Sequence, residues 1–76
     1  MLKLKYFGMI AEAINKSEED FIFVENLDAL TLELKEKYPK LNDLNYKFAV
    51  NQTLVATNIV LKESDEIALL PPFAGG

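Results

Sequence analysis

The sequence contains no cysteine and no histidine. Without cysteine the chain can form neither a disulfide scaffold nor a thiol nucleophile, and without both residues it lacks the ligands of the usual zinc sites. A serine–histidine–aspartate triad is excluded as well. We therefore expect a chain that is not catalytic alone and that binds no metal and no cofactor of its own.

Carboxylates remain as acid–base groups. They gather in two clusters among turn-forming or hydrophilic residues, so we interpret both clusters as solvated surface. The first cluster contains Glu12, Glu18, Glu19 and Asp20, and the second contains Glu63, Asp65 and Glu66.

Positive charge and long hydrophobic runs are also scarce. Lysine and arginine number 8 against 12 aspartates and glutamates, so the formal net charge is −4, which disfavours nucleic acid and anionic membranes as partners. The opening MLKLKYFGMI interleaves lysine with apolar residues and lacks the apolar run of a secretion signal, and no later segment approaches membrane-spanning length. We expect a cytoplasmic protein.

The apolar content is that of a globular domain, with 50% hydrophobic and 11% aromatic residues. A chain of 76 residues forms one domain that buries only about 60% of its unfolded surface. Internal repeats and low-complexity segments are absent from the sequence. We predict a folded domain over residues 1–70 and a projecting tail over residues 71–76.

The first part of the chain has patterns typical of a strand, a short helix and a second strand. Residues 2–7 alternate in hydropathy with the period of a half-buried strand. Ile10 and Ile14 have helical spacing and predict two turns over residues 9–16. Residues 21–24, FIFV, form a compact β-forming run that we expect to pair with the first strand.

The main helix follows this second strand. Asn26 can cap its first turn, and Pro39 ends it because proline cannot continue the hydrogen-bond ladder. Its predicted buried stripe consists of Leu27, Leu30, Leu34 and Tyr38.

Three further strands are predicted after a polar loop, over residues 46–50, 53–56 and 66–70, with a turn at Asn51-Gln52 and a core contact at Leu61. The fold class is therefore α+β, with a mixed sheet packed on one long helix. This order resembles the ubiquitin-like roll, or β-grasp, in which the last strand runs through the centre of the sheet.

The final residues, PPFAGG, have the composition of an extended tail that can enter the active site of another protein. Extended at about 3.3 Å per residue, they reach roughly 20 Å, and Pro71 and Pro72 lower the entropic cost of ordering them. Gly75 and Gly76 have no Cβ, so a narrow tunnel can grip their backbone. The Gly76 carboxylate is a poor electrophile until a partner activates it, because its pKa of about 3.5 leaves it ionised.

Several stretches resemble the small subunit of molybdopterin synthase, a family of ubiquitin-like sulfur carriers. They are KLKYFG, KYP, FAVNQTLV, ESDEIALLPP and the terminal FAGG. The resemblance implies that a ubiquitin-activating-like enzyme uses ATP to adenylate the Gly76 carboxylate, which a sulfur donor converts to a thiocarboxylate. It also implies that the large synthase subunit binds the tail in a heterotetramer and passes the sulfur to cyclic pyranopterin monophosphate.

The residues expected to contact partners precede Gly75. Phe73 is interpreted as an anchor for a partner pocket. Leu70 is expected to be exposed because Ile67 and Leu69 share the other face of their strand, and Leu54 is either core or contact surface. The full set of partner-binding candidates is Leu54, Leu70, Pro71, Pro72, Phe73 and Ala74. Two positions depart from the family, Ala11 where many relatives have arginine and Phe73 where valine is frequent.

Three readings of the function stay open. The first is the sulfur carrier for molybdenum cofactor synthesis that the resemblance implies. The second is a carrier for thiamine synthesis or transfer-RNA thiolation, or a ubiquitin-like protein modifier. The third is an interaction domain whose tail docks without reacting, because fold alone does not determine function.

Overall fold

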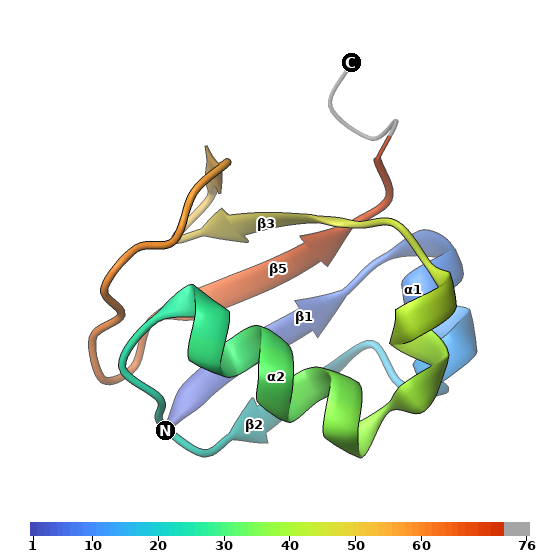
Figure 1. Cartoon of the computed structure of the whole chain (residues 1–76), viewed down its shortest axis with the longest axis horizontal. Coiled ribbons are helices and arrows are strands. Elements are labelled where there is room, and N and C mark those ends of the chain that lie inside the picture. The colour runs from blue at the N-terminus through green and yellow to red at the C-terminus, as the bar shows by residue number, and fades with distance from the viewer. Residues whose placement is uncertain (73–76) are drawn as a thin grey trace.

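The computed structural model describes residues 1–72 of the chain. A five-stranded sheet forms one layer and the helices pack on one of its faces (Figure 1). The elements are β1 (Leu2–Tyr6), α1 (Gly8–Ile14), β2 (Glu18–Phe21), α2 (Leu27–Lys37), the 3₁₀ helix η1 (Pro39–Asp43), β3 (Lys47–Val50), β4 (Thr53–Val55) and β5 (Glu66–Leu70).

The strands lie in the order β2-β1-β5-β3-β4. β1 and β5 are parallel, whereas the other neighbouring strands are antiparallel. The last strand therefore runs through the centre of a mixed sheet, as Figure 1 shows. The predicted ubiquitin-like β-grasp fold is confirmed.

Alternate residues of the two central strands β1 and β5 point into the core. The inward residues Leu2, Leu4 and Tyr6 of β1 are buried, and so are Ile67 and Leu69 of β5. These side chains pack in one cluster with the buried leucines of α2. Burial of an aliphatic side chain of this size contributes about 1.5–3 kcal/mol to stability, so the parallel pair β1–β5 anchors the domain.

The predicted main helix is confirmed at both ends. The Asn26 side chain accepts a hydrogen bond of 2.8 Å from the Ala29 N–H, which satisfies one free donor of the first turn. The helix ends before Pro39, which opens η1 instead. The predicted stripe faces the core: Leu27, Leu30 and Leu34 are buried, and Tyr38 is half-buried.

The predicted second strand was wrong in position. β2 spans Glu18–Phe21 rather than residues 21–24. Its register places Phe21 opposite Leu2, the first residue of β1, so the residues after Phe21 have run past the end of their partner strand. Ile22 and Phe23 are consequently exposed, although their composition favours a strand.

The segment after α2 was predicted to be a polar loop, but it forms η1 and buries Leu41. The other predictions for this half are confirmed. Asn51 and Gln52 form the turn between β3 and β4 with positive φ angles of 49° and 70°, the geometry that closes a tight hairpin. Leu61 is buried in the core as expected.

Candidate functional site

One face of the sheet is left uncovered by the helices. Residues opposite one another on paired strands share a face, and the register aligns Lys5, Ala68, Ala49 and Leu54 in one row across β1, β5, β3 and β4. These four residues line a shallow hollow of about 300 Å³. We call this surface the open face.

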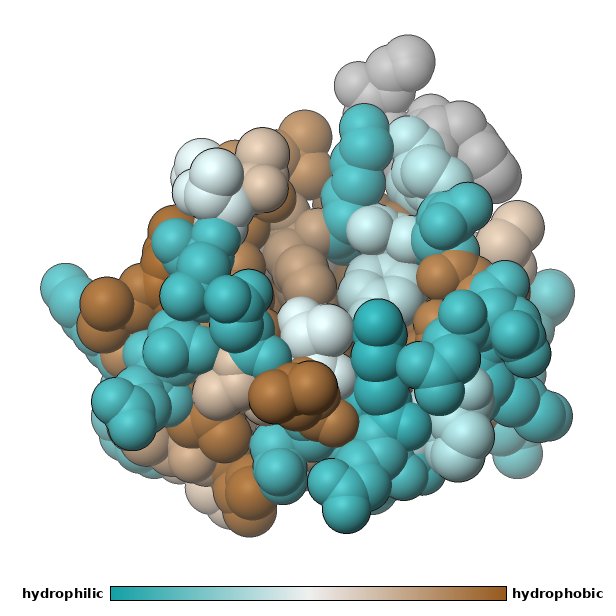
Figure 2. All heavy atoms as spheres, in the orientation of Figure 1, coloured by the Kyte–Doolittle hydropathy of each residue, from teal (hydrophilic) through white to brown (hydrophobic). Residues whose placement is uncertain are grey.

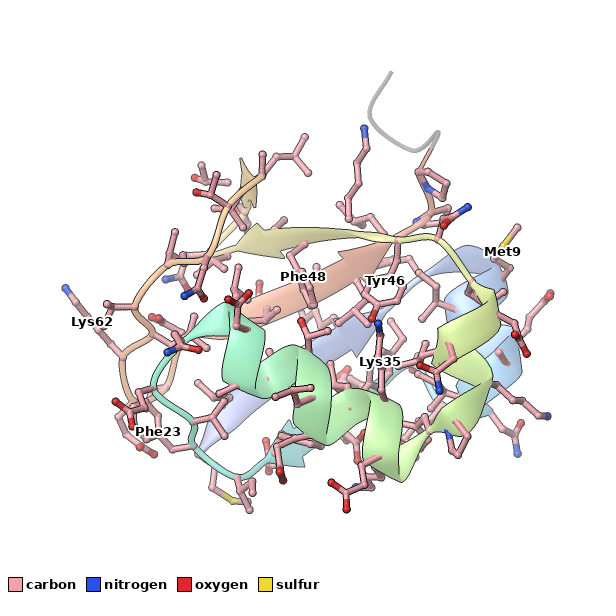
Figure 3. The ribbon with its side chains drawn as sticks, in the orientation of Figure 1. Met9, Phe23, Lys35, Tyr46, Phe48 and Lys62 are labelled. Carbon is pink, nitrogen blue, oxygen red and sulfur yellow. The ribbon has the colours of Figure 1, made fainter. Side chains whose placement is uncertain are left out.

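The opposite face of the same strands is filled by core side chains. Figure 3 shows Tyr46 and Phe48 between β3 and α2, where their rings pack edge to face with centroids 5.5 Å apart. Phe48 lies opposite the buried Leu69. The bulky residues of β3 therefore point to the helices, and its neighbour Ala49 is left on the open face.

The centre of the open face is apolar. Leu54 is 52% exposed and Phe7 is 44% exposed, and Ala68 and Leu70 between them are half-buried. A contiguous apolar surface is unusual on a small charged domain and is typical of a protein–protein contact. The open face is therefore a candidate docking surface.

Polar groups border this apolar centre. The Lys5 ammonium lies 3.2 Å from a Glu66 carboxylate oxygen, and both side chains are partly exposed. Lys47 lies opposite Leu70 on the neighbouring strand, and so it lies on the same face. An apolar centre with a polar, solvent-accessible rim is the usual anatomy of an interface.

The hairpin that carries Leu54 is tied to the start of β5. The Asn51 side chain accepts from the Glu66 N–H at 3.0 Å and donates to Asp65 at 3.0 Å. This bond from Asn51, together with one from the Lys62 N–H, lowers the pKa of Asp65 below its ordinary value. The turn is thereby fixed relative to the rest of the open face.

The end of β5 is held by the segment that joins β1 to α1. The Phe7 N–H donates to the Leu69 carbonyl at 3.2 Å. Next to it, Gly8 has φ +57° and lies so close to Pro71 that a Cβ on Gly8 would be 2.8 Å from the Pro71 ring. Pro71 is buried and Pro72 is exposed, so the chain leaves the sheet from a packed base.

Comparison with known proteins shows the family. The ThiS family matches residues 4–76. This chain belongs to the ThiS family. A molybdopterin synthase sulfur carrier subunit from Mycobacterium tuberculosis is 36% identical, with 93% of this chain and 92% of the relative covered. The resemblance to the small-subunit family is thus confirmed.

Two solved structures share the ThiS-family fold of this chain. A chain from a protein–protein complex of subunits 1 and 2 of the molybdopterin-converting factor of Helicobacter pylori is 32% identical, with a TM-score of 0.74 and coverage of 99% of this chain and 97% of that one. The small archaeal modifier protein 1 of Methanosarcina acetivorans is 26% identical, with a TM-score of 0.83 and coverage of 99% and 95%.

In this ThiS-family chain, the structure brings together part of the predicted site. Leu54 lies on the open face rather than in the core, and Leu70 shares that face but is half-buried rather than fully exposed. Pro71 and Pro72 continue directly from it. The predicted residues Phe73, Ala74, Gly75 and Gly76 lie outside the described residues.

Sequence reasoning missed three apolar members of the open face, Phe7, Ala49 and Ala68. For Phe7 and Ala68 the signal was the alternation of the strands, which places Phe7, directly after β1, on the side opposite the core residues of β1 and places Ala68 on the same side of β5 as Leu70. Ala49 could not be found in this way, because its contribution depends on the register between β3 and β5.

Glu19 was predicted to be solvated, but its side chain is largely buried. The Glu19 side chain is 11% exposed and accepts hydrogen bonds from the hydroxyls of Tyr6 at 2.5 Å and Tyr38 at 2.6 Å. Lys37 donates to it at 3.0 Å. Burial alone would raise the pKa of Glu19, but the bonds from Tyr38, Tyr6 and Lys37 lower it to about 2.

Glu19 therefore joins β1, β2 and the end of α2, and its role is structural. Among residues 1–72, no three potential metal ligands lie together as a cluster. In the same part of the chain, no helix has the length and apolar character needed to cross a membrane.

Proposed function

We propose that this chain is the sulfur carrier subunit of molybdopterin synthase and acts in molybdenum cofactor synthesis. The observation that carries the proposal is the match to a carrier subunit of that name at 36% identity over nearly all of both chains. The open face supports it, because a carrier needs a docking surface next to the segment that bears its cargo.

In the proposed reaction, the working group is the Gly76 carboxylate. An adenylating enzyme transfers AMP from ATP to this carboxylate, releases pyrophosphate and gives the carboxylate carbon a leaving group. Sulfide from a sulfur donor then displaces AMP and leaves a thiocarboxylate, which donates its sulfur to cyclic pyranopterin monophosphate while water restores the Gly76 carboxylate. ATP is bound by the activating partner and not by this chain, which supplies no catalytic side chain.

The large synthase subunit is the proposed partner of the open face. The structure of the Helicobacter pylori complex of subunits 1 and 2 supports such a pairing. Leu54 and Leu70 would contact the large subunit directly, while Pro72, Phe73 and Ala74 would lead Gly75 and Gly76 into its active site. The location that suits this chemistry is the cytoplasm.

The proposal is tested by intact-mass measurement after incubation with the activating enzyme, ATP and a sulfide donor. Replacement of one carboxylate oxygen by sulfur is expected in the parent chain. Deletion of Gly76, or addition of one residue after it, should abolish this mass change and sulfur transfer while thermal unfolding stays the same. Unchanged cofactor production by either variant contradicts the proposal.

A second function uses the same carboxylate. The similarity to a small archaeal modifier protein, at 26% identity and a TM-score of 0.83, supports transfer of the activated Gly76 to a lysine amine. Mass spectrometry of proteins from the native cell distinguishes the two functions. Lysines that carry the C-terminal residues of this chain in isopeptide linkage support the modifier, and a terminal thiocarboxylate without such linkages supports the sulfur carrier.

A further inference from the structure

β2 is an edge strand with one side unused. It pairs with β1 through the register Leu2–Phe21, Lys3–Asp20, Leu4–Glu19 and Lys5–Glu18. Within residues 1–72, no other strand pairs with β2. An exposed strand edge presents backbone donors and acceptors that a further strand can use.

The pairing shows which backbone groups are free. The Tyr6 N–H donates to the Ser17 carbonyl at 2.9 Å, and hydrogen-bonded and non-hydrogen-bonded pairs alternate along an antiparallel ladder. Glu19 and Phe21 therefore direct their N–H and C=O groups toward β1. Asp20 lies between them and directs its N–H and C=O groups away from the sheet, as does Ile22 where the alternation continues.

A groove lies beside this edge. It has a volume of about 500 Å³ and is formed by β2 and the residue after it on one side and α2 on the other. Its apolar lining includes Met1 and Ile22, which are 59% and 54% exposed. Figure 2 shows hydrophobic surface at the lower edge of the molecule, where β2 and the N-terminus lie in Figure 1. Every second side chain of an added strand would point into this groove.

The charges around the edge are mostly negative. Glu33 and Glu36 line the groove from α2, and Asp20 lines it from β2. The one lysine in the lining, Lys37, is 3.0 Å from Glu19 and 5.3 Å from the centre of the Phe21 ring, so its charge is already paired. The edge therefore favours an incoming segment with positive charge.

Charge also argues against a second copy of this chain at the same edge. Antiparallel pairing of two β2 strands, each with the sequence EEDF, would bring acidic side chains opposite acidic side chains, which destabilises a sheet. A basic strand has the reverse effect. Lys3 and Lys5 already lie opposite Asp20 and Glu18 from β1, and a lysine from the other side would extend this alternation of charge.

We propose that the free edge of β2 and its groove bind an extended segment of a partner protein in which lysine or arginine alternates with β-branched apolar residues. The basic side chains would lie beside Glu18 and Asp20, and the apolar ones would enter the groove beneath α2. The segment would add to the sheet as a sixth strand, through backbone hydrogen bonds to Asp20 and Ile22.

This second surface is separate from the open face. β1 lies between β2 and β5, so the docked segment would be three strand spacings, about 14 Å, from the strand that leads to Pro71. The chain could thus hold such a partner while its tail is occupied. Deletion of Gly76 is expected to leave binding at β2 unchanged, which makes the two proposals independent.

The first test uses the peptide acetyl-KVKVKVK-amide and amide NMR of the ¹⁵N-labelled chain. The expected result is a saturable shift of the Asp20 and Ile22 signals, with the signals of Ala49 and Ala68 unchanged. The same peptide with a methyl group on the backbone nitrogen of its third residue, a lysine, keeps the charge but loses one backbone donor that faces β2 in antiparallel pairing, and should bind about threefold to tenfold more weakly. Acetyl-EVEVEVE-amide should not bind.

The second test uses the chain itself. Asp20→Pro removes the outward N–H but no hydrogen bond to β1, and Asp20→Asn keeps the N–H and removes the charge. Asp20→Pro should weaken peptide binding about threefold to tenfold relative to Asp20→Asn. Thermal unfolding establishes that both variants fold, and if Asp20→Pro does not, the peptide methylated on its backbone nitrogen makes the same comparison.

Three outcomes would overturn the proposal. The first is equal binding of the lysine and glutamate peptides, and the second is a peptide shift confined to Ala49 and Ala68 on the open face. The third is a shift of the β2 signals on raising the protein concentration without peptide, which would assign the edge to a second copy of the chain.

Discussion

Two features of the backbone at position 8, its φ angle and its contact with Pro71, favour glycine there. Its φ of +57° costs other residues about 1–2 kcal/mol, and a Cβ there would be 2.8 Å from the Pro71 ring. We expect Gly8→Ala to lower the free energy of unfolding by about 1–3 kcal/mol, as measured by chemical denaturation. In a Pro71→Ala background, which removes the ring, the cost should fall toward that of the φ angle alone. An equal cost in both backgrounds would show that the contact is not the cause.

Glu19 carries a pH dependence whose sign follows from its partners. Its pKa is lowered from 4.5 to about 2 in the folded chain, so its ionised form stabilises the fold above about pH 4.5 and this stabilisation is lost as the pH falls toward 2. We expect Glu19→Gln to lower the free energy of unfolding by about 1–3 kcal/mol at neutral pH. The difference from the parent should shrink between those pH values.

The exposed neighbour Glu18 offers the control for this prediction. Glu18→Gln should change the free energy of unfolding by less than about 0.5 kcal/mol, because surface charges contribute little. A difference between Glu19→Gln and the parent that stays constant from neutral pH to pH 2 would contradict the assignment of the pKa. Urea denaturation at a series of pH values measures both variants.

The contrast between these two glutamates shows where single-residue prediction from sequence ends. Glu18 and Glu19 are adjacent and chemically identical, and both were expected in water. Only Glu19 points inward, and the hydroxyl groups that stabilise its charge come from β1 and from the end of α2. By comparison, Leu4 and Ile67 could be predicted as core, because the alternation of their own strands is sufficient.

At the scale of elements, the local preferences of the residues predicted the position of α2 but not that of β2, because the position of β2 depends on pairing with another strand. α2 carries its cap, its apolar stripe and its terminating proline in one continuous segment, so its position could be read directly. β2 is different: its residues are mostly acidic, and its position depends on the length of β1 and on the register with Leu2. The same dependence on a partner left a free edge that no local pattern indicates.

The sequence gives little indication of η1, yet we expect η1 to contribute strongly to the free energy of unfolding. Leu41 is 1% exposed in the core, although polar residues surround it in the sequence. We expect Leu41→Ala to lower the free energy of unfolding by about 2–5 kcal/mol, the range for a leucine that leaves a cavity. Leu44→Ala, at a half-buried position just after η1, should cost clearly less. Equal melting temperatures for the two variants would mean that η1 does not belong to the core.

At the scale of the whole molecule, the sequence patterns and the resemblance to a known family together predicted the topology, and the chemistry proposed at Gly76 follows from that resemblance. The element order follows from hydropathy and turn signals, whereas the central position of β5 was implied by the resemblance to the β-grasp fold. The open face follows only in part, because it consists of residues from four strands whose register appears in three dimensions. Its small residues matter because they leave room between Leu54 and Leu70; alternation indicates Ala68, whereas Ala49 depends on the register between β3 and β5.

Two exposed leucines lie on different parts of the domain and allow a direct test of which surface binds the large synthase subunit. Leu54 is 52% exposed on the open face, and Leu32 is 70% exposed on α2. Leu54→Asp places a charge in the apolar centre and should weaken affinity for the large subunit at least about tenfold, the effect of losing an interface anchor. Leu32→Asp adds the same charge to the chain and should leave affinity within about twofold, because surface substitutions away from a contact have small effects.

Isothermal titration calorimetry of both variants against the large subunit separates the local effect from the change in net charge. Because Leu54 and Leu32 are both exposed, neither substitution creates a cavity, and circular dichroism should show the same unfolding transition for each. Equal losses of affinity would indicate that repulsion by the added charge acts over the whole molecule. A loss confined to Leu32→Asp would move the docking surface to α2, and the tail would then have to approach its partner from the helical side of the sheet.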